Sequence, residues 1–139
     1  VSLFDTIDSV GSYRLAKKIS KTASTQSKKQ RVLIQINTSG ETTKGGFNPE
    51  EKKEVLKCFN LSNIKIEGLM TMGPPTNNKE DIKKSFVLLK KIFLEINKKI
   101  LSEQEMKTIS MGMSGDFLIG VESGSTMVRV GTAIFGKRE

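Results

Sequence analysis

A turn suited to binding phosphate is the clearest chemical feature of this sequence, and it lies near the C-terminus. Residues 126–130 are β-branched or apolar apart from Arg129, which predicts a short buried strand. Gly131 and Thr132 follow directly, and residues 133–135 can begin a helical turn. Free N–H groups at such a turn favour an anion, and glycine lets a ligand approach the backbone closely. Thr132 adds a hydroxyl donor, and Arg129 could contact the other end of a phosphorylated ligand. An ordinary strand and turn is the alternative that this motif alone leaves open.

Strand-like and helix-like segments alternate along the whole chain, which predicts an α/β fold with parallel strands. The strands are expected at 3–8, 31–37, 64–72, 106–112 and 126–130, and the helices after Ser9 or Ser12 and at 49–59, 79–101 and 115–122. The segment 31–37 is nearly continuous in apolar residues, which is typical of a strand buried on both faces.

Residues that favour helix starts precede the later helices. Asn48 is expected to cap the second helix, with Pro49 in its first position, and Asn78 to cap the longest one. Ser114 is expected to cap the helix at 115–122. The first helix should bury one apolar face, made of Leu15, Ala16, Ile19 and Ala23.

Polar and small residues follow each strand, at the end where parallel α/β folds bind ligands. They include Asn37, the segment 71–73, Met113 and Ser114. Ser114, at a helix N-terminus, is a second candidate phosphate donor beside Gly131 and Thr132. In (β/α)₈ barrels the loops after the seventh and eighth strands often hold phosphate. The last two strands of this chain are therefore expected to be the last two of a barrel, although only five of the eight strands are visible.

Chain length, net charge and the absence of His limit the classes of function that are compatible with this sequence. The chain has 139 residues, enough for one domain, and a net charge of +8 from 23 Lys and Arg against 15 Asp and Glu. Such a balance could attract nucleic acid, an anionic membrane or phosphorylated small molecules. Most of the Lys residues lie along helix-like segments, which favours a solvated surface. The absence of His removes a His base and most zinc sites, and no run is long enough to span a bilayer.

Four segments together resemble the pyridoxal phosphate homeostasis protein family. They are residues 32–41, 68–72, 110–116 and 124–136, and the last two are specific in combination. The resemblance covers essentially the whole chain. It implies a (β/α)₈ TIM barrel of the alanine racemase N-terminal type, with pyridoxal 5′-phosphate at the carboxyl ends of the strands and only strands 4–8 present here.

The resemblance also implies roles for individual residues. The phosphate of the cofactor would meet Ser114, Gly131 and Thr132, with Met113 beside them. Arg129 would approach the pyridine nitrogen. Asn37, at the end of the segment that resembles the fifth strand, completes the expected cofactor-binding set. No catalytic residue and no metal site is expected.

One part of the family pattern is missing. The lysine that links covalently to the cofactor belongs to the first strand, and no residue here matches it. Lys44, on the loop after the strand expected at 31–37, is at best an auxiliary contact. We therefore expect residues 1–139 to form a single partial domain, the C-terminal part of a longer protein, a truncated product or one piece of a split protein. A five-strand part leaves sheet edges open, and a separate chain supplying strands 1–3 could cover them.

The implied function is intracellular homeostasis of pyridoxal 5′-phosphate, as a carrier or reservoir without turnover. An Arg beside the ring cannot protonate its nitrogen, so the bound ring would be a weak electron sink. Three alternatives stay open: a fragment of a racemase or lyase dependent on this cofactor, a nucleic-acid-binding module, and a remnant that does not bind. We expect no nucleic-acid or membrane partner, a monomeric intact protein, and a cytoplasmic location, for which a single Cys is typical.

Overall fold

The computed structural model describes residues 1–42 and 45–138, which form one layer of parallel strands with helices between them. All neighbouring strands are parallel, and their order in the sheet equals their order in the chain. The elements are β1 (Thr6–Val10), α1 (Tyr13–Thr25), β2 (Gln30–Gln35), α2 (Lys52–Cys58), β3 (Ile64–Met70), α3 (Lys79–Asn97), the short 3₁₀ helix η1 (Ser102–Gln104), β4 (Thr108–Met113), α4 (Phe117–Glu122), β5 (Met127–Arg129) and α5 (Thr132–Phe135).

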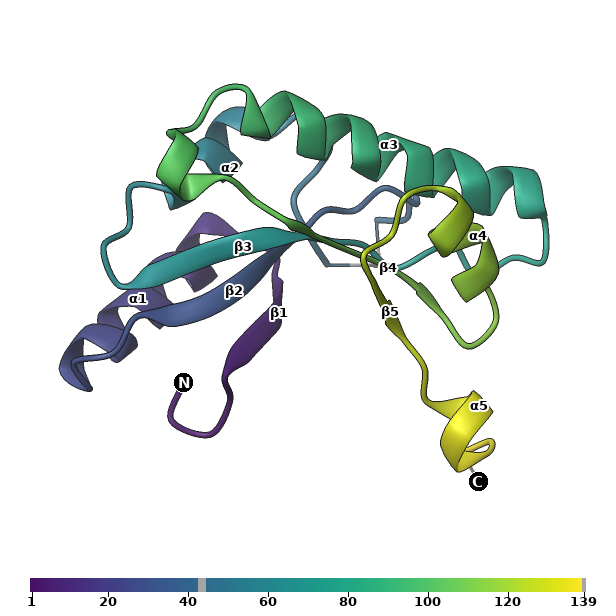
Figure 1. Cartoon of the computed structure of the whole chain (residues 1–139), viewed down its shortest axis with the longest axis horizontal. Helices are drawn as coiled ribbons and strands as arrows, with labels where there is room; N and C mark the ends of the chain where they lie inside the picture. The colour runs from purple at the N-terminus through teal and green to yellow at the C-terminus, as the bar shows by residue number, and fades with distance from the viewer. Residues whose placement is uncertain (43–44, 139) are drawn as a thin grey trace.

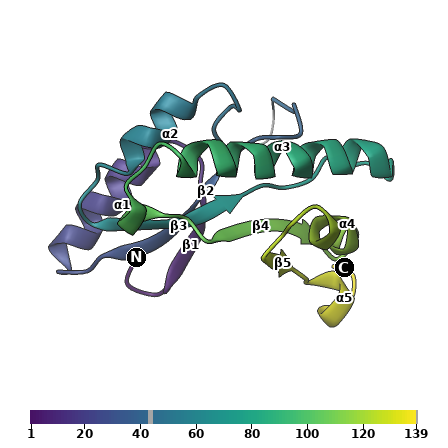
Figure 2. The ribbon, with the colours of Figure 1, turned by 45° about the horizontal axis from the view of Figure 1, so that its top comes forward.

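The sheet is an open half-barrel, as predicted. Helices α1, α2 and α3 lie along one side of it, and β1 and β5 form its two edges (Figure 1). In a turned view α2 and α3 lie above the strands and α1 lies at the left of the sheet, with α4 and α5 beside β5 at the C-terminal edge (Figure 2). A strand order without reversals and with helices on one side is the arrangement from which barrels are built.

The hydrophobic core lies between the sheet and the three helices. Alternate residues of the strands enter it, including Val32 and Ile34 of β2, and they meet a stripe on α3 that contains Phe86 and Leu89. The opposite side of the sheet is the concave one. Leu33 of β2 is also buried, although it is not part of the core cluster, so β2 is buried on both faces as predicted.

Several predicted boundaries were wrong. The second helix begins at Lys52 rather than Pro49; residues 48–51 form a turn before it, in which the Glu51 N–H donates to the Asn48 carbonyl at 2.9 Å. The fourth helix begins at Phe117, so Ser114 is not its cap. Leu15 was expected in the buried face of α1 but is 38% exposed.

The two edge strands of the sheet, β1 and β5, differ most from the prediction. The first strand starts at Thr6, and Leu3, predicted within it, is exposed. The last strand spans only Met127–Arg129 and is not buried, because β5 has no neighbour on its outer side. The caps predicted at Ser12 and Asn78 are confirmed, each side-chain oxygen accepting a backbone N–H of the first turn.

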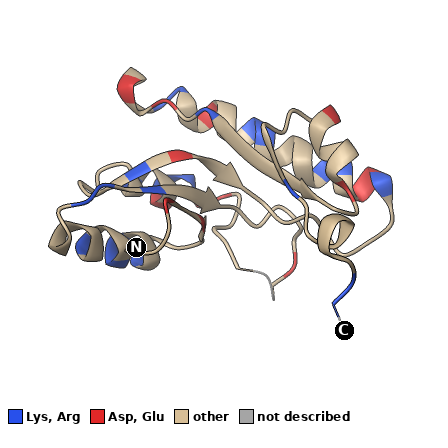
Figure 3. Ribbon diagram, turned by 60° about the horizontal axis from the view of Figure 1, so that its bottom comes forward, with Lys and Arg blue, Asp and Glu red and all other residues tan. Residues whose placement is uncertain are grey.

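Charge is spread over the helices. Lys and Arg occur along α1 without Asp or Glu, whereas both signs are interleaved along α3 (Figure 3). The Lys residues of α3 lie off its apolar stripe, and none of them is among the buried residues of the helix. Within the described residues no helix is both long and apolar enough to cross a membrane. The same residues hold no group of three His, Cys, Asp or Glu placed to bind a metal ion.

Candidate phosphate and cofactor site

Most of the predicted site residues meet at the carboxyl ends of β4 and β5. Arg129, the last residue of β5, pairs in register with Met113, the last residue of β4. Ser114 follows β4 directly, and Gly131 and Thr132 follow β5 by two and three residues. Adjacent parallel strands end at one edge, so the two loops are neighbours. The structure therefore brings together five of the six predicted residues.

The Ser114 hydroxyl joins the two loops. Its Oγ accepts the backbone N–H of Gly131 at 3.1 Å and that of Ala133 at 3.2 Å. Two N–H groups of a helix start thus converge on a single oxygen. That arrangement is also how helix N-termini hold a phosphate oxygen. In this structure the serine oxygen is the acceptor for both donors, so a phosphate oxygen bound at this turn would replace or share that acceptor position.

The turn after β5 is open to a ligand. Gly131 is exposed, and a Cβ built on it would have no atom within 4 Å. Its φ of −127° is one that other residues adopt, so the backbone conformation does not require glycine here. What glycine provides is free space beside the N–H groups. Thr132, the first residue of α5, is exposed next to it.

Arg129 reaches across the concave side of the sheet. Its Nη2 donates to the Thr71 carbonyl at 2.7 Å, so the side chain crosses β4 from β5 to the end of β3. Burial lowers the pKa of Arg129 from its ordinary value, while the charges of Asp8 and Asp116 act to raise it. A guanidinium stays protonated at neutral pH despite such a shift. The residue is therefore a fixed cation at the strand ends.

Two buried polar atoms beside Thr71 lack a partner among the described residues: Nη1 of Arg129 and Oγ of Ser110. Ser110 is fully buried on β4, and its carbonyl accepts the Thr71 N–H at 3.0 Å. Ile109 and Met111 belong to the core, so the alternation of the strand turns Ser110 to the concave side. Buried polar atoms are rarely left without a hydrogen bond, so these two are the groups at this strand end whose hydrogen-bonding capacity is unused.

Asn37 is placed differently from the other five residues. It follows β2, two strands away from β4, and its side chain is engaged within its own loop. Its Nδ2 donates to the Glu41 carbonyl at 2.6 Å, and its Oδ1 accepts from the Ser39 hydroxyl at 3.0 Å. These contacts hold the loop at the strand end. Lys44, the predicted auxiliary contact, lies outside the described residues.

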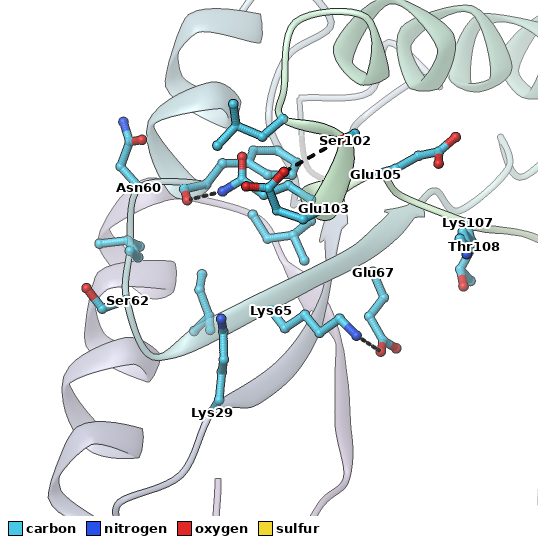
Figure 4. A pocket seen from close by; sticks show the side chains of 16 residues that line it. Lys29, Asn60, Ser62, Lys65, Glu67, Ser102, Glu103, Glu105, Lys107 and Thr108 are labelled. Carbon is cyan, nitrogen blue, oxygen red and sulfur yellow. Dashed lines mark hydrogen bonds and ion pairs between the residues drawn. The ribbon is translucent and has the colours of Figure 1, made fainter.

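A cavity of about 740 Å³ lies at the opposite end of the sheet. It is lined by residues at the start of β3 and β4 and on η1, including Lys65 and Glu67, whose charged atoms are 3.8 Å apart (Figure 4). None of the predicted site residues lines it. Parallel α/β folds bind ligands at the other end of the strands, so we do not assign the cofactor to this cavity.

Two contributors to the site were not singled out by sequence reasoning. The Ala133 N–H donates to Ser114, and the Thr71 carbonyl holds Arg129. Every residue has the same main-chain groups, so the residue types do not show which of them take part in a site. The position of Thr71 in a segment expected at a strand end was the one feature of the sequence that pointed to it.

The model of the alanine racemase N-terminal domain family matches residues 5–139, almost the full chain. The chain belongs to this family. The half-barrel is therefore a partial form of the alanine racemase N-terminal barrel fold, as the resemblance implied.

Individual members of the family extend the comparison. The pyridoxal phosphate homeostasis protein of Aquifex aeolicus is 40% identical over 134 residues, which cover 96% of this chain and 58% of that protein. The structure of PipY from Synechococcus elongatus with pyridoxal phosphate bound superposes with a TM-score of 0.85 at 27% identity, over 98% of this chain and 63% of that one. An alanine racemase from Clostridium difficile, with a TM-score of 0.79 at 24% identity over 96% of this chain and 34% of that one, shares the fold. The chain thus spans little more than half the length of its curated relative.

Proposed function

We propose that this chain binds pyridoxal 5′-phosphate at the carboxyl ends of β4 and β5 and serves in the homeostasis of that cofactor. The observation that carries the proposal is the convergence on one oxygen of the N–H groups of Gly131 and Ala133, which lie two and four residues after the half-buried Arg129. The names of the relatives support it: the Aquifex protein is a pyridoxal phosphate homeostasis protein, and PipY has been solved with this cofactor bound.

The residues present fit a ligand with a phosphate at one end and a hydrogen-bond acceptor at the other. Ser114, Gly131, Ala133 and the neighbouring Thr132 would hold the phosphate, and Met113 lies beside them. Nη1 of Arg129, which has no hydrogen-bond partner among the described residues, would be a donor for the ring nitrogen. Arg129 is the last residue of β5 and lies two positions before Gly131, so a single small molecule could contact both ends of the site.

The chemistry of the ring partner favours a carrier over an enzyme. When bound, the cofactor supplies an electron sink, whose strength depends on a protonated ring nitrogen. Arg129 keeps its own protons and can only donate a hydrogen bond, so it holds that nitrogen neutral. A racemase would also need a general base. Tyr13 is the tyrosine that could be considered for this role, but its side chain packs against the hydrophobic core. Storage and delivery of the cofactor fit this set of side chains better than turnover.

Completion of the barrel belongs to the same proposal. The curated relative is longer than this chain, and both edges of the five-stranded sheet are open among the described residues. Three more β/α units would complete the eight strands of a barrel. We place these units either on the same polypeptide or on a separate chain, and the complete protein as a monomer in the cytoplasm. The phosphate contacts lie on β4 and β5, so they do not depend on the added units.

The phosphate contacts can be tested with three probes. The 139-residue chain should bind pyridoxal 5′-phosphate saturably in equilibrium dialysis, and inorganic phosphate should compete for the same site. Pyridoxal, which lacks the phosphate, should bind at least about tenfold more weakly, since hydrogen bonds to a charged group contribute roughly 1.5–3 kcal/mol. Equal affinity for pyridoxal and its phosphate would show that the loops after β4 and β5 do not hold the phosphate.

A further inference from the structure

A chain of three buried hydroxyl groups lies behind the carboxyl ends of β2 and β3. Oγ1 of Thr38 is 2.7 Å from Oγ1 of Thr71 and 2.6 Å from Oγ of Ser85 on α3. Thr71 Oγ1 in turn donates to the Ile36 carbonyl at 2.8 Å. All three hydroxyl residues are at most 9% exposed. The chain thus ties two strand ends to the longest helix, away from solvent.

The direction of these hydrogen bonds follows from proton counting. Each hydroxyl has one proton, and the Ile36 carbonyl can only accept, so Thr71 donates its proton there. Thr71 must then accept from Thr38, and Thr38 must accept from Ser85. The order is therefore Ser85 to Thr38 to Thr71 to Ile36. A buried network in which every proton has one acceptor holds its members in one arrangement.

Thr71 connects this network to the opposite side of the sheet. Its side chain faces α3, while its carbonyl accepts Nη2 of Arg129 at 2.7 Å and its N–H donates to the Ser110 carbonyl at 3.0 Å. The carbonyl position depends on the backbone conformation of Thr71, which the hydroxyl chain restrains. Arg129 is in turn left with Nη1 buried and without a partner.

We propose that Thr71, restrained by Thr38 and Ser85, is a positioning residue that sets the guanidinium of Arg129 for ligand recognition. The proposal rests on the proposed binding of pyridoxal 5′-phosphate and assigns a role to residues that touch no ligand. The hydroxyl network restrains the Thr71 carbonyl, and that carbonyl holds Nη2 of Arg129. Because the guanidinium is planar, the position of Nη2 then limits the direction in which Nη1 can donate. Loss of the network should make the orientation of the Arg129 guanidinium more variable without altering the loops after β4 and β5.

A double-mutant cycle tests the coupling. Thr71→Val keeps the shape of the side chain but removes the hydrogen bonds of its hydroxyl, and it should weaken binding of pyridoxal 5′-phosphate about tenfold. Arg129→Met should remove the contact directly. If Thr71 acts through Arg129, Thr71→Val has little further effect in the Arg129→Met background. Inorganic phosphate should bind both single variants with wild-type affinity, because its contacts lie on other residues.

Controls separate positioning from folding. Thr71→Ser keeps the hydroxyl and should restore wild-type affinity, and Thr22→Val removes an exposed helical hydroxyl and should change nothing. Ser85→Ala removes only the first donor of the chain and should weaken binding in the same direction, less than Thr71→Val. Independent effects of Thr71→Val and Arg129→Met, or wild-type affinity of Thr71→Val, would overturn the proposal.

A measurement on the ligand-free protein separates this proposal from the proposed function. The bond from Nη2 to the Thr71 carbonyl should slow rotation of the Arg129 guanidinium in NMR spectra, and Thr71→Val should accelerate it. Unchanged rotation would contradict the positioning role whether or not the cofactor binds. If the wild type binds no pyridoxal 5′-phosphate, the function fails while the rotation measurement still decides the positioning role.

Discussion

The substitution Gly68→Ala should lower the free energy of unfolding by about 3 kcal/mol or more, near or beyond the upper end of usual overpacking costs. A Cβ at this position would lie 1.8 Å from the Thr108 carbonyl oxygen and 2.6 Å from its carbon. Both atoms belong to the backbone of β4, which pairs with β3 at this residue. No side-chain rotation can relieve the clash, so the two strands must separate. Urea denaturation followed by far-UV circular dichroism measures the change.

Gly115→Ala is the matched control. A Cβ at Gly115 has no atom within 4 Å, and its φ is not in the left-handed region. The same chemical change should therefore alter the free energy of unfolding by less than about 0.5 kcal/mol, the usual range for surface substitutions. Equal stabilities of the two variants would show that β3 and β4 do not approach each other as closely as described.

The substitution Arg129→Met should weaken binding of pyridoxal 5′-phosphate roughly 10- to 100-fold, the range for losing a hydrogen bond from a charged group. Methionine fills much of the same space, but it cannot donate to the Thr71 carbonyl or to a ring nitrogen. Isothermal titration calorimetry gives the affinity. Affinity for inorganic phosphate should stay close to that of the wild type, since Arg129 is not among the donors to the phosphate oxygen.

Arg14→Met supplies the charge control for this measurement. Arg14 lies exposed on α1, and its loss changes the net charge by the same amount. If the two variants weakened binding equally, the basic character of the chain would be responsible rather than a specific contact. If Arg129→Met left the affinity for pyridoxal 5′-phosphate unchanged, the ring end of the proposed site would be wrong.

The order and type of the elements could be predicted from the sequence because each strand and helix has a clear apolar pattern. Residues 32–36 are apolar apart from Gln35, and the stripe on 79–101 repeats every three or four residues. The start of the second helix could not be predicted in the same way. Asn48 and Pro49 form a good helix start locally, but residues 48–51 form a turn closed by the Glu51 N–H and the Asn48 carbonyl, and the helix follows at Lys52. Boundaries depend on such single hydrogen bonds, which residue types do not determine.

The phosphate end of the site was more predictable than its ring end. Ser114, Gly131 and Thr132 follow strands directly, and parallel topology brings strand ends together. The role of Ser114 was only partly foreseen, because it was expected to cap α4 and instead accepts two N–H groups from the next loop. The anchoring of Arg129 by Thr71 involves residues 58 positions apart and a main-chain carbonyl. No local pattern encodes such a contact.

The central claim, noncovalent binding of pyridoxal 5′-phosphate at the ends of β4 and β5, is tested most directly by titrating the wild-type chain and following visible circular dichroism. Borohydride reduction and mass spectrometry of the saturated protein complete the measurement. We expect a saturable induced signal that inorganic phosphate abolishes, with no stoichiometric adduct on any single lysine. Absence of an induced signal at saturating cofactor, or a stoichiometric adduct on one lysine, would contradict it.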